Sequence, residues 1–311
     1  MRRVLCAFLM LAVLIGMSGA AVAAQDGTPA VTDPNLLADL GYPELRVTTD
    51  GTTNDFPTEV EAGRYHVVLD NQSDQMEIDL EFWQLPEGVT VDDVMAFFEE
   101  AQETGDFGVP DFFFDMTFNG GPTTSPGQSD SVVLDLTPGE WYVNVYSYNP
   151  ETDESTDTVA TVTVTGEMPE LPAPEADVTV ELVDFDFAVS GSVSSGPQIW
   201  EVTGAGSQPH HLVLSRVPEG TTEEDVIELA GTFFVPPPDP SATPAATPVI
   251  QPALAFEDVE EVFYTLIFTQ GQYNLYDLTL EPGTYAMICF LPAPDGTPHV
   301  LMGMVEIITV E

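Results

Sequence analysis

Short runs of alternating apolar and polar residues recur along most of the chain. The runs are rich in β-branched and aromatic residues and are separated by Gly, Pro, Asn and Asp, a pattern typical of half-buried β-strands. The pattern predicts an all-β fold. We expect strands at 66–69, 141–146, 160–164, 178–182, 199–202, 211–214, 285–289 and 305–310.

Helical spacing follows two threonines. Thr90 and Thr222 each have an Asp three residues later, which is the pattern of a capped helix start. Apolar residues then follow at helical intervals, namely Val94, Phe97 and Phe98 in one case and Val226, Ile227 and Ala230 in the other. We therefore predict one short helix within each half of the chain.

The two halves repeat each other. The segment 85–94 matches 217–226, and the segment 136–141 matches 280–285 with 12 more residues in between. The Pro-rich tract 236–252 accounts for the extra length and is predicted to be a surface loop. A single repeat of this length indicates duplicated domains rather than a solenoid. Each copy fits a Greek-key β-sandwich with one inserted helix.

The domain boundaries follow from composition. Residues 1–24 have a basic start, an apolar run and a small-residue end, as in a cleavable secretory signal. Residues 25–43 form a polar lead-in, 44–165 the first domain, 166–176 a Pro-rich linker and 177–311 the second domain. We expect an exported protein, either periplasmic or outside the cell envelope, with no membrane insertion after the signal is cleaved.

The chain is strongly acidic, with 52 Asp and Glu against five basic residues and a formal net charge of −47. Nucleic acid and anionic lipid bind through Lys and Arg, so both are excluded as partners. The commoner meaning of such a charge is a surface adapted to salt or acid. The functional alternative is electrostatic steering towards a partner with a basic docking face.

Soft metal ligands occur in a characteristic order in the second half. His210 and His211 precede an apolar strand, and further on Cys289 is followed after nine residues by His299 and after four more by Met304. A thiolate, two imidazoles and a weak thioether are the ligand set of a trigonal copper site for electron transfer. Cys289 is the single cysteine left after signal removal, so the alternative is an inert, buried small hydrophobe.

These segments resemble the cupredoxin family, which includes plastocyanin, azurin and the type-1 copper domain of copper nitrite reductase. Pro-Gly-Thr-Tyr before Cys289 is similar to the penultimate strand of that family, and 299–305 is similar to its His-x4-Met ending. The resemblance covers residues 177–311 and implies that His210, Cys289, His299 and Met304 hold one copper ion. The loop from Cys289 to His299 is longer than in the small blue-copper proteins and nearer that of the nitrite reductase domain.

Several assignments stay open at this point. His211 is a rival to His210, and because strand alternation sends them to opposite faces only one is expected to be a ligand. Met304 is preferred to Met302 by its spacing from His299 alone. His66 is interpreted as structural. The first copy has Ile78 and Asp79 in place of the two histidines and Val145 in place of Cys289, so it is predicted to lack the metal site.

Two functions from different classes fit these residues. The first is a type-1 copper electron carrier, in which the resemblance implies that Cys289 supplies electronic coupling and His299 the exit route. The alternative is a metal-free structural or binding module at the cell surface. Enzyme classes are disfavoured, because the chain has no hydrolytic or phosphate-binding motif and too few histidines for further copper centres.

Overall fold

The computed structural model describes residues 36–104, 109–234 and 252–311, with the side chains of 98–104 left out. The predicted signal and the Pro-rich tract up to residue 251 lie outside the described residues. The predicted fold class is confirmed, since the chain forms two β-sandwiches, each with one helix of more than two turns. The domain boundaries stay a prediction. Among the described residues no helix is long and apolar enough to cross a membrane.

The first sandwich consists of two sheets. One contains β1 (Glu44–Thr49), β2 (Asn54–Asp55), β4 (Gly63–Asn71) and β8 (Ser129–Leu136). The other contains β3 (Glu59–Glu61), β5 (Glu77–Gln84), β6 (Thr117–Phe118), β7 (Thr123–Thr124), β9 (Gly139–Asn149) and β10 (Glu154–Thr165). Its helices are α2 (Val91–Thr104) and the 3-10 turn η2 (Asp111–Asp115).

The second sandwich repeats this pairing. One sheet contains β11 (Val178–Val183), β12 (Asp186–Gly191), β13 (Gly196–Gly204) and β16 (Tyr273–Leu280). The other contains β14 (Val213–Val217), β15 (Glu260–Tyr264), β17 (Gly283–Ile288) and β18 (Val305–Val310), with α3 (Glu223–Phe233), η3 (Phe256–Asp258) and η4 (His299–Met302). In both copies the first strand pairs in parallel with the strand that follows its hairpin, β1 with β4 and β11 with β13.

The predicted helix caps are present. The Thr222 hydroxyl accepts from the Asp225 backbone N–H while the Asp225 carboxylate accepts from the Thr222 backbone N–H, a complete capping box. Thr90 and Asp93 form the same pair of bonds at the start of α2. The equivalent local chemistry at both sites agrees with a duplicated unit.

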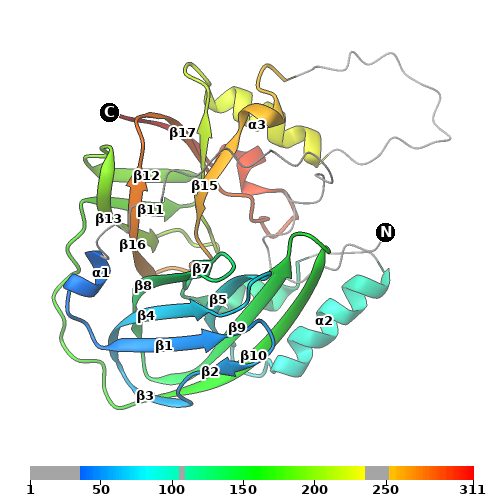
Figure 1. Ribbon diagram of the computed structural model, residues 1–311. Coiled ribbons are helices and arrows are strands. Elements are labelled where there is room, and N and C mark those ends of the chain that lie inside the picture. Colours follow the sequence, from blue (N-terminus) through cyan, green and yellow to red (C-terminus); the bar gives the residue numbers. More distant parts are fainter. Residues whose placement is uncertain (1–35, 105–108, 235–251) are drawn as a thin grey trace.

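The two sandwiches are joined edge to edge (Figure 1). β8 pairs with β16 through Val133 and Leu275, so one eight-stranded sheet runs through both copies. The short helix α1 (Leu36–Asp39) covers this junction and buries Leu37 against both strands. A second contact is made by backbone hydrogen bonds of Gly120 with Ile267 and of Phe118 with Thr269.

A side chain from the second sandwich completes this joint. The Asn274 amide oxygen accepts from the Gly121 N–H at 2.8 Å, and its amide nitrogen donates to the Asn119 carbonyl at 2.9 Å. Gly120 has a φ of +58°, and a Cβ there would collide with Asn274 and the Phe268 ring. The joint therefore requires glycine at this position.

Candidate metal centre

Three predicted ligands come from three separate places in the second sandwich. His210 lies just before β14 and pairs with Phe268 through two backbone hydrogen bonds of 2.9 and 2.8 Å. Cys289 follows directly after β17, and its N–H donates to the Met304 carbonyl at 3.3 Å. His299 opens η4, and its N–H donates to the Leu291 carbonyl at 2.8 Å.

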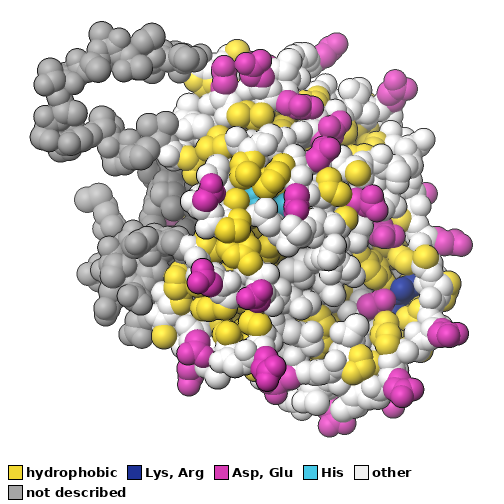
Figure 2. Space-filling view, turned by 180° about the vertical axis from the view of Figure 1, so that it is seen from behind, with side chains coloured by type: hydrophobic (Ala, Val, Ile, Leu, Met, Phe, Trp, Pro, Cys, Tyr) yellow, Lys and Arg dark blue, Asp and Glu magenta, His cyan; other side chains and the backbone are white. Residues whose placement is uncertain are grey.

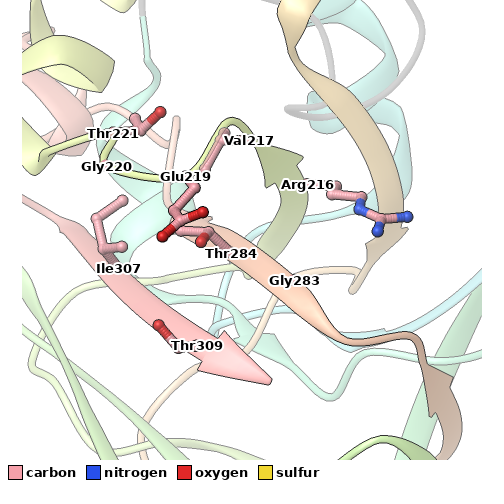
Figure 3. Close-up of a pocket in the computed structure, with 9 residues that line it drawn as sticks. All are labelled: Arg216, Val217, Glu219, Gly220, Thr221, Gly283, Thr284, Ile307 and Thr309. Carbon is pink, nitrogen blue, oxygen red and sulfur yellow. The ribbon is translucent and has the colours of Figure 1, made fainter. Parts of the chain in front are cut away.

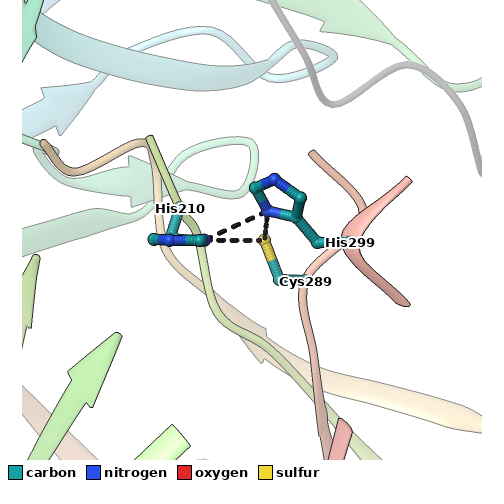
Figure 4. Close-up of side chains that lie close together, drawn as sticks. All are labelled: His210, Cys289 and His299. Atoms are coloured by element: carbon teal, nitrogen blue, oxygen red, sulfur yellow. Dashed lines mark hydrogen bonds between the residues drawn. The ribbon is translucent and has the colours of Figure 1, made fainter. Parts of the chain in front are cut away.

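Their ligating atoms converge on one point (Figure 4). The Cys289 Sγ lies 3.9 Å from the His210 Nδ1 and 3.5 Å from the His299 Nδ1, and the two Nδ1 atoms are 3.1 Å apart. All three side chains are fully buried. Among the described residues this is the one group of three His, Cys, Asp or Glu side chains close enough to share a metal ion.

The spacing of these atoms suits a metal ion. With metal–nitrogen bonds of about 2.0 Å and a metal–sulfur bond of about 2.3 Å, a trigonal arrangement places neighbouring ligand atoms about 3.5 to 3.7 Å apart. The three observed separations, 3.1, 3.5 and 3.9 Å, bracket that range. The donor set is two imidazoles and one thiol, which is the set expected for copper.

Hydrogen bonds on the far side of each ring orient the two imidazoles. The His210 Nε2 lies 3.0 Å from an Asp184 carboxylate oxygen, and the His299 Nε2 lies 3.3 Å from the Gln208 amide oxygen. A carboxylate can only accept, so the His210 Nε2 carries the proton and its Nδ1 presents a lone pair to the cluster. Such outer partners are typical of metal-binding histidines.

Burial keeps the cluster uncharged in the absence of metal. It raises the pKa of the Cys289 thiol to about 12, against the effect of backbone N–H groups of His211 and Leu291 that favour the thiolate. Burial also lowers the pKa of His299 to about 3, and the neighbouring His210 adds to that effect. The pKa of His210 is likewise lowered by burial, although Asp184 opposes the shift. Neutral imidazoles are the form that binds metals.

Asp184 itself is held as a carboxylate. Burial favours its neutral form, but hydrogen bonds from Ser207, His210 and Gln208 outweigh burial and lower its pKa below the usual value. Asp184 and Gln208 could not be predicted from the sequence. No local motif marks either residue, since both act through contacts between segments far apart in the chain.

His211 points away from the cluster, although strand alternation is not the reason, because β14 begins at Val213 and not at His211 as predicted. Its Nε2 accepts from the Phe290 backbone N–H at 2.9 Å, and the ring is buried. Burial lowers the pKa of His211 to about 3, with smaller contributions from His299 and His210. His211 therefore supports the backbone next to Cys289, and His210 is the histidine that lies in the candidate cluster.

Two single variants, one at His211 and one at His210, test this distinction. We expect His211→Phe to keep Cu(II) binding at one ion per chain but to lose about 1–3 kcal/mol of stability, because the Phe290 N–H loses its acceptor. His210→Gln should lose tight Cu(II) binding. Isothermal titration and urea unfolding measure the two effects. Loss of binding in the His211 variant with retention in the His210 variant would reverse the assignment.

Met304 is the better placed of the two candidate methionines. Its side chain is fully buried, and its N–H donates to the His299 carbonyl at 3.0 Å. Met302 is 40% exposed, which does not suit a ligand within a buried cluster. The role of Met304 as a weak fourth ligand stays a prediction.

The first sandwich holds different side chains at the matching positions. Ile78 and Val145 are buried in its hydrophobic core, and Asp79 faces the second sandwich instead of a ligand cluster. His66 lies on β4, where burial lowers its pKa. Within the described ranges it belongs to no group of three possible metal ligands, and its structural interpretation stays a prediction.

A groove of about 660 Å³ lies elsewhere in the second sandwich (Figure 3). It is lined by the turn after β14 and by β17 and β18, with Glu219 and three threonines as polar groups. Arg216 points away from Ile307 and Thr309 in Figure 3, and its guanidinium donates to Glu281 and to the Pro282 carbonyl. No set of charged or metal-ligating groups converges in this groove.

No family model and no curated protein matches the chain. Solved structures similar to it include reduced auracyanin from Roseiflexus castenholzii, at 15% identity and a TM-score of 0.27 over 43% of this chain and 94% of that one. Auracyanin B matches at 24% identity and a TM-score of 0.25, over 46% and 92% of the two chains. The copper-containing nitrite reductase from Thermus scotoductus matches at 10% identity and a TM-score of 0.20, over 86% and 61%.

At these scores the overall likeness adds nothing to the geometry of the site. The resemblance to cupredoxins rests on the chain's own residues. Those residues are the buried His210, Cys289 and His299, which the all-β fold brings together in the order and spacing that the resemblance implies.

Proposed function

We propose that the second sandwich binds one copper ion as a type-1 centre and that the protein carries single electrons. The observation that supports this most directly is the convergence of one thiol and two Nδ1 atoms in a fully buried cluster. Zinc sites with this ligand type are normally tetrahedral, with four strong ligands, whereas two His, one Cys and a weak thioether favour copper. Met304 would supply that thioether.

The residues of the chain would divide the work as follows. When bound, copper supplies a one-electron Cu(II)/Cu(I) couple. Cys289 would give up its proton and provide the main electronic coupling, with backbone N–H groups directed at its sulfur. His210 would be fixed from behind by Asp184. His299, next to half-buried Gln208, would be the exit route for the electron. Buried, fixed ligands keep water away from the centre.

The surroundings of the site fit a docking face. Figure 2 shows a small area of histidine beside hydrophobic side chains, with Asp and Glu side chains around them. In a chain with a net charge of −47, such a rim would attract a basic redox partner and repel an acidic one. We propose that the protein works outside the cytoplasm and exchanges electrons with a partner of that kind.

Copper titration of the purified protein tests the proposed function. We expect one tightly bound Cu(II) per chain, an intense thiolate-to-copper absorption band and the electron paramagnetic resonance signal of a type-1 centre. Cys289→Ser should lose the band completely, because the thiolate is its source. His66→Asn is the matched control, since it removes a buried histidine outside the cluster, and it should keep the band.

Two results would contradict the proposal. One is weak, spectroscopically ordinary copper binding that Cys289→Ser leaves unchanged. The other is a site that prefers Zn(II) and gives no band with Cu(II). In either case the metal-free structural or binding module would be the better description of this protein.

A further inference from the structure

The turn between β11 and β12 contacts both candidate histidine ligands. Asp184 lies against the His210 Nε2, and the ring of the next residue, Phe185, meets the His299 ring edge-on at a centroid distance of 5.4 Å. Phe185 has a φ of +67°, a left-handed conformation that is strained for a bulky residue. The strained residue thus lies in the turn that contacts the two histidines of the cluster.

Three hydrogen-bond donors besides His210 hold the Asp184 carboxylate. One oxygen accepts from the backbone N–H groups of Ser207 and Gln208 at 2.9 and 3.1 Å, and the other accepts from the Ser207 hydroxyl at 2.6 Å. Gly206 allows this approach, because a Cβ there would collide with both Asp184 and His210. The carboxylate is thus fixed in position before any metal arrives.

The two histidines receive different partners. His210 faces an anionic carboxylate at 3.0 Å, whereas His299 faces the neutral amide of Gln208 at 3.3 Å. Building on the proposed function, we propose that Asp184 is a positioning residue that sets the reduction potential of the copper centre through His210. Its negative charge favours the more positively charged Cu(II) over Cu(I), and so lowers the potential.

The physical basis is the carboxylate–histidine–metal arrangement. The carboxylate fixes the proton on the His210 Nε2, directs the Nδ1 lone pair at the metal and makes the imidazole a stronger donor. Loss of such an outer partner typically costs 10- to 100-fold in metal affinity. Because the negative charge attracts Cu(II) more strongly than Cu(I), its removal should lower the affinity for Cu(II) more than the affinity for Cu(I).

Asp184→Asn tests this inference with minimal change of shape. The asparagine Oδ1 can still accept from the His210 Nε2 and from the backbone N–H groups of Ser207 and Gln208. Its Nδ2 can donate to the Ser207 hydroxyl oxygen, which reverses that one bond, so the variant removes the charge and keeps each contact. We expect Cu(II) affinity to fall at least tenfold more than Cu(I) affinity. For one electron, that ratio corresponds to a rise in reduction potential of about 59 mV or more, measured by direct voltammetry on copper-loaded protein.

Asp186→Asn is the matched control. It removes the same charge two residues further along, at the start of β12, where Asp186 is exposed and accepts from the Phe187 N–H. The control should move the potential much less than Asp184→Asn. Equal shifts in the two variants, or no shift in either, would overturn the inference.

Failure of this inference is distinguishable from failure of the proposed function. If the unmodified protein gives no type-1 band, the proposed function fails. If the band is present and Asp184→Asn leaves the potential unchanged, only the role of Asp184 fails. If the Asp184→Asn variant does not fold, a measurement on the unmodified protein without metal still tests the inference. Nitrogen-15 NMR of this apoprotein should show the His210 ring protonated at Nε2 and not at Nδ1. The opposite tautomer would contradict the role of Asp184.

Discussion

Raising the pH from 5 to 9 is expected to weaken the contact between the two sandwiches and to lower the free energy of unfolding by several kcal/mol. The cause is a pair of buried carboxyl groups on β5. Asp79 accepts a hydrogen bond from the Tyr264 hydroxyl at 2.8 Å, and Glu81 accepts from the Ile267 N–H at 3.1 Å. Both donors belong to the second sandwich.

The sign of the effect follows from the direction of the pKa shifts. Burial raises the pKa of Asp79 from 3.8 to about 7 and that of Glu81 from 4.5 to about 8, even though their hydrogen bonds oppose the shift. Nearby acidic groups, Glu77, Glu261 and Asp157, raise the pKa of Asp79 further. The folded protein therefore retains protons that the unfolded chain has already released.

The stability from these two groups is fully present below about pH 4 and is lost as the pH rises towards 8. Between its unfolded-state and folded-state pKa, each group lowers the free energy of unfolding by about 1.4 kcal/mol for each unit that the pH rises. Above pH 8 their contribution no longer changes. The contact between the two sandwiches is therefore more stable in acid than at neutral or alkaline pH.

Urea unfolding at several pH values between 5 and 9, on protein kept free of added metal, measures this dependence. Asp79→Asn with Glu81→Gln keeps both hydrogen-bond acceptors and removes both titrations, so its stability should change much less with pH. Glu167→Gln with Glu170→Gln removes two exposed linker charges and serves as the control for general repulsion. A double variant at 79 and 81 with the same pH slope as the unmodified protein would rule out this pair as the cause.

Replacing Arg64 by Leu should lower the free energy of unfolding by about 3 kcal/mol, because it breaks a largely buried ion pair with Asp135 and three further contacts of the same guanidinium. Arg64 lies on β4 with a side chain only 5% exposed, and its Nε and Nη2 donate to both oxygens of Asp135 at 2.7 and 3.2 Å. Its Nη1 donates to the Pro172 carbonyl of the predicted linker at 2.9 Å. The guanidinium also lies over the rings of Tyr42 and Tyr273.

A lysine at position 64 cannot make the same contacts, because it lacks the planar guanidinium that donates to Asp135 and to the Pro172 carbonyl at the same time. We expect Arg64→Lys to recover part of the loss. The control is Arg46→Leu, since Arg46 is 46% exposed and pairs with exposed Glu44, which makes a change of less than about 1 kcal/mol expected. Urea midpoints compare the three variants. Equal losses at positions 64 and 46 would show that the Arg64 contacts do not stabilise the joint.

Much of the local structure could be predicted from sequence. The β-branched runs and the Thr–Asp caps are signals carried within a few residues, and they agree with the structure except that the strand predicted at 211–214 begins at Val213. The order of His210, Cys289 and His299 also indicated the group that the structure brings together. The choice between His210 and His211 could not be made that way. Alternation would put them on opposite faces but does not say which face meets Cys289.

The contacts between the sandwiches had no sequence signal at all. On β5, alternation of Ile78, Leu80 and Phe82 with acidic residues predicts one buried face and one wet face. The second face is in fact covered by the second sandwich, which buries Asp79 and Glu81. Among 52 acidic residues nothing distinguishes these two. Asp184 was missed for the same reason, since its role depends on a partner 26 residues away.

The segment that pairs with His210 also forms the joint to the first sandwich. Phe268 bonds to His210 on one side, while its neighbours Ile267 and Thr269 bond to Gly120 and Phe118 on the other. Substitutions at Gly120 or Asn119 in the first sandwich would therefore disturb the backbone that holds His210 in the second, so the sequences of the two halves constrain each other where they touch.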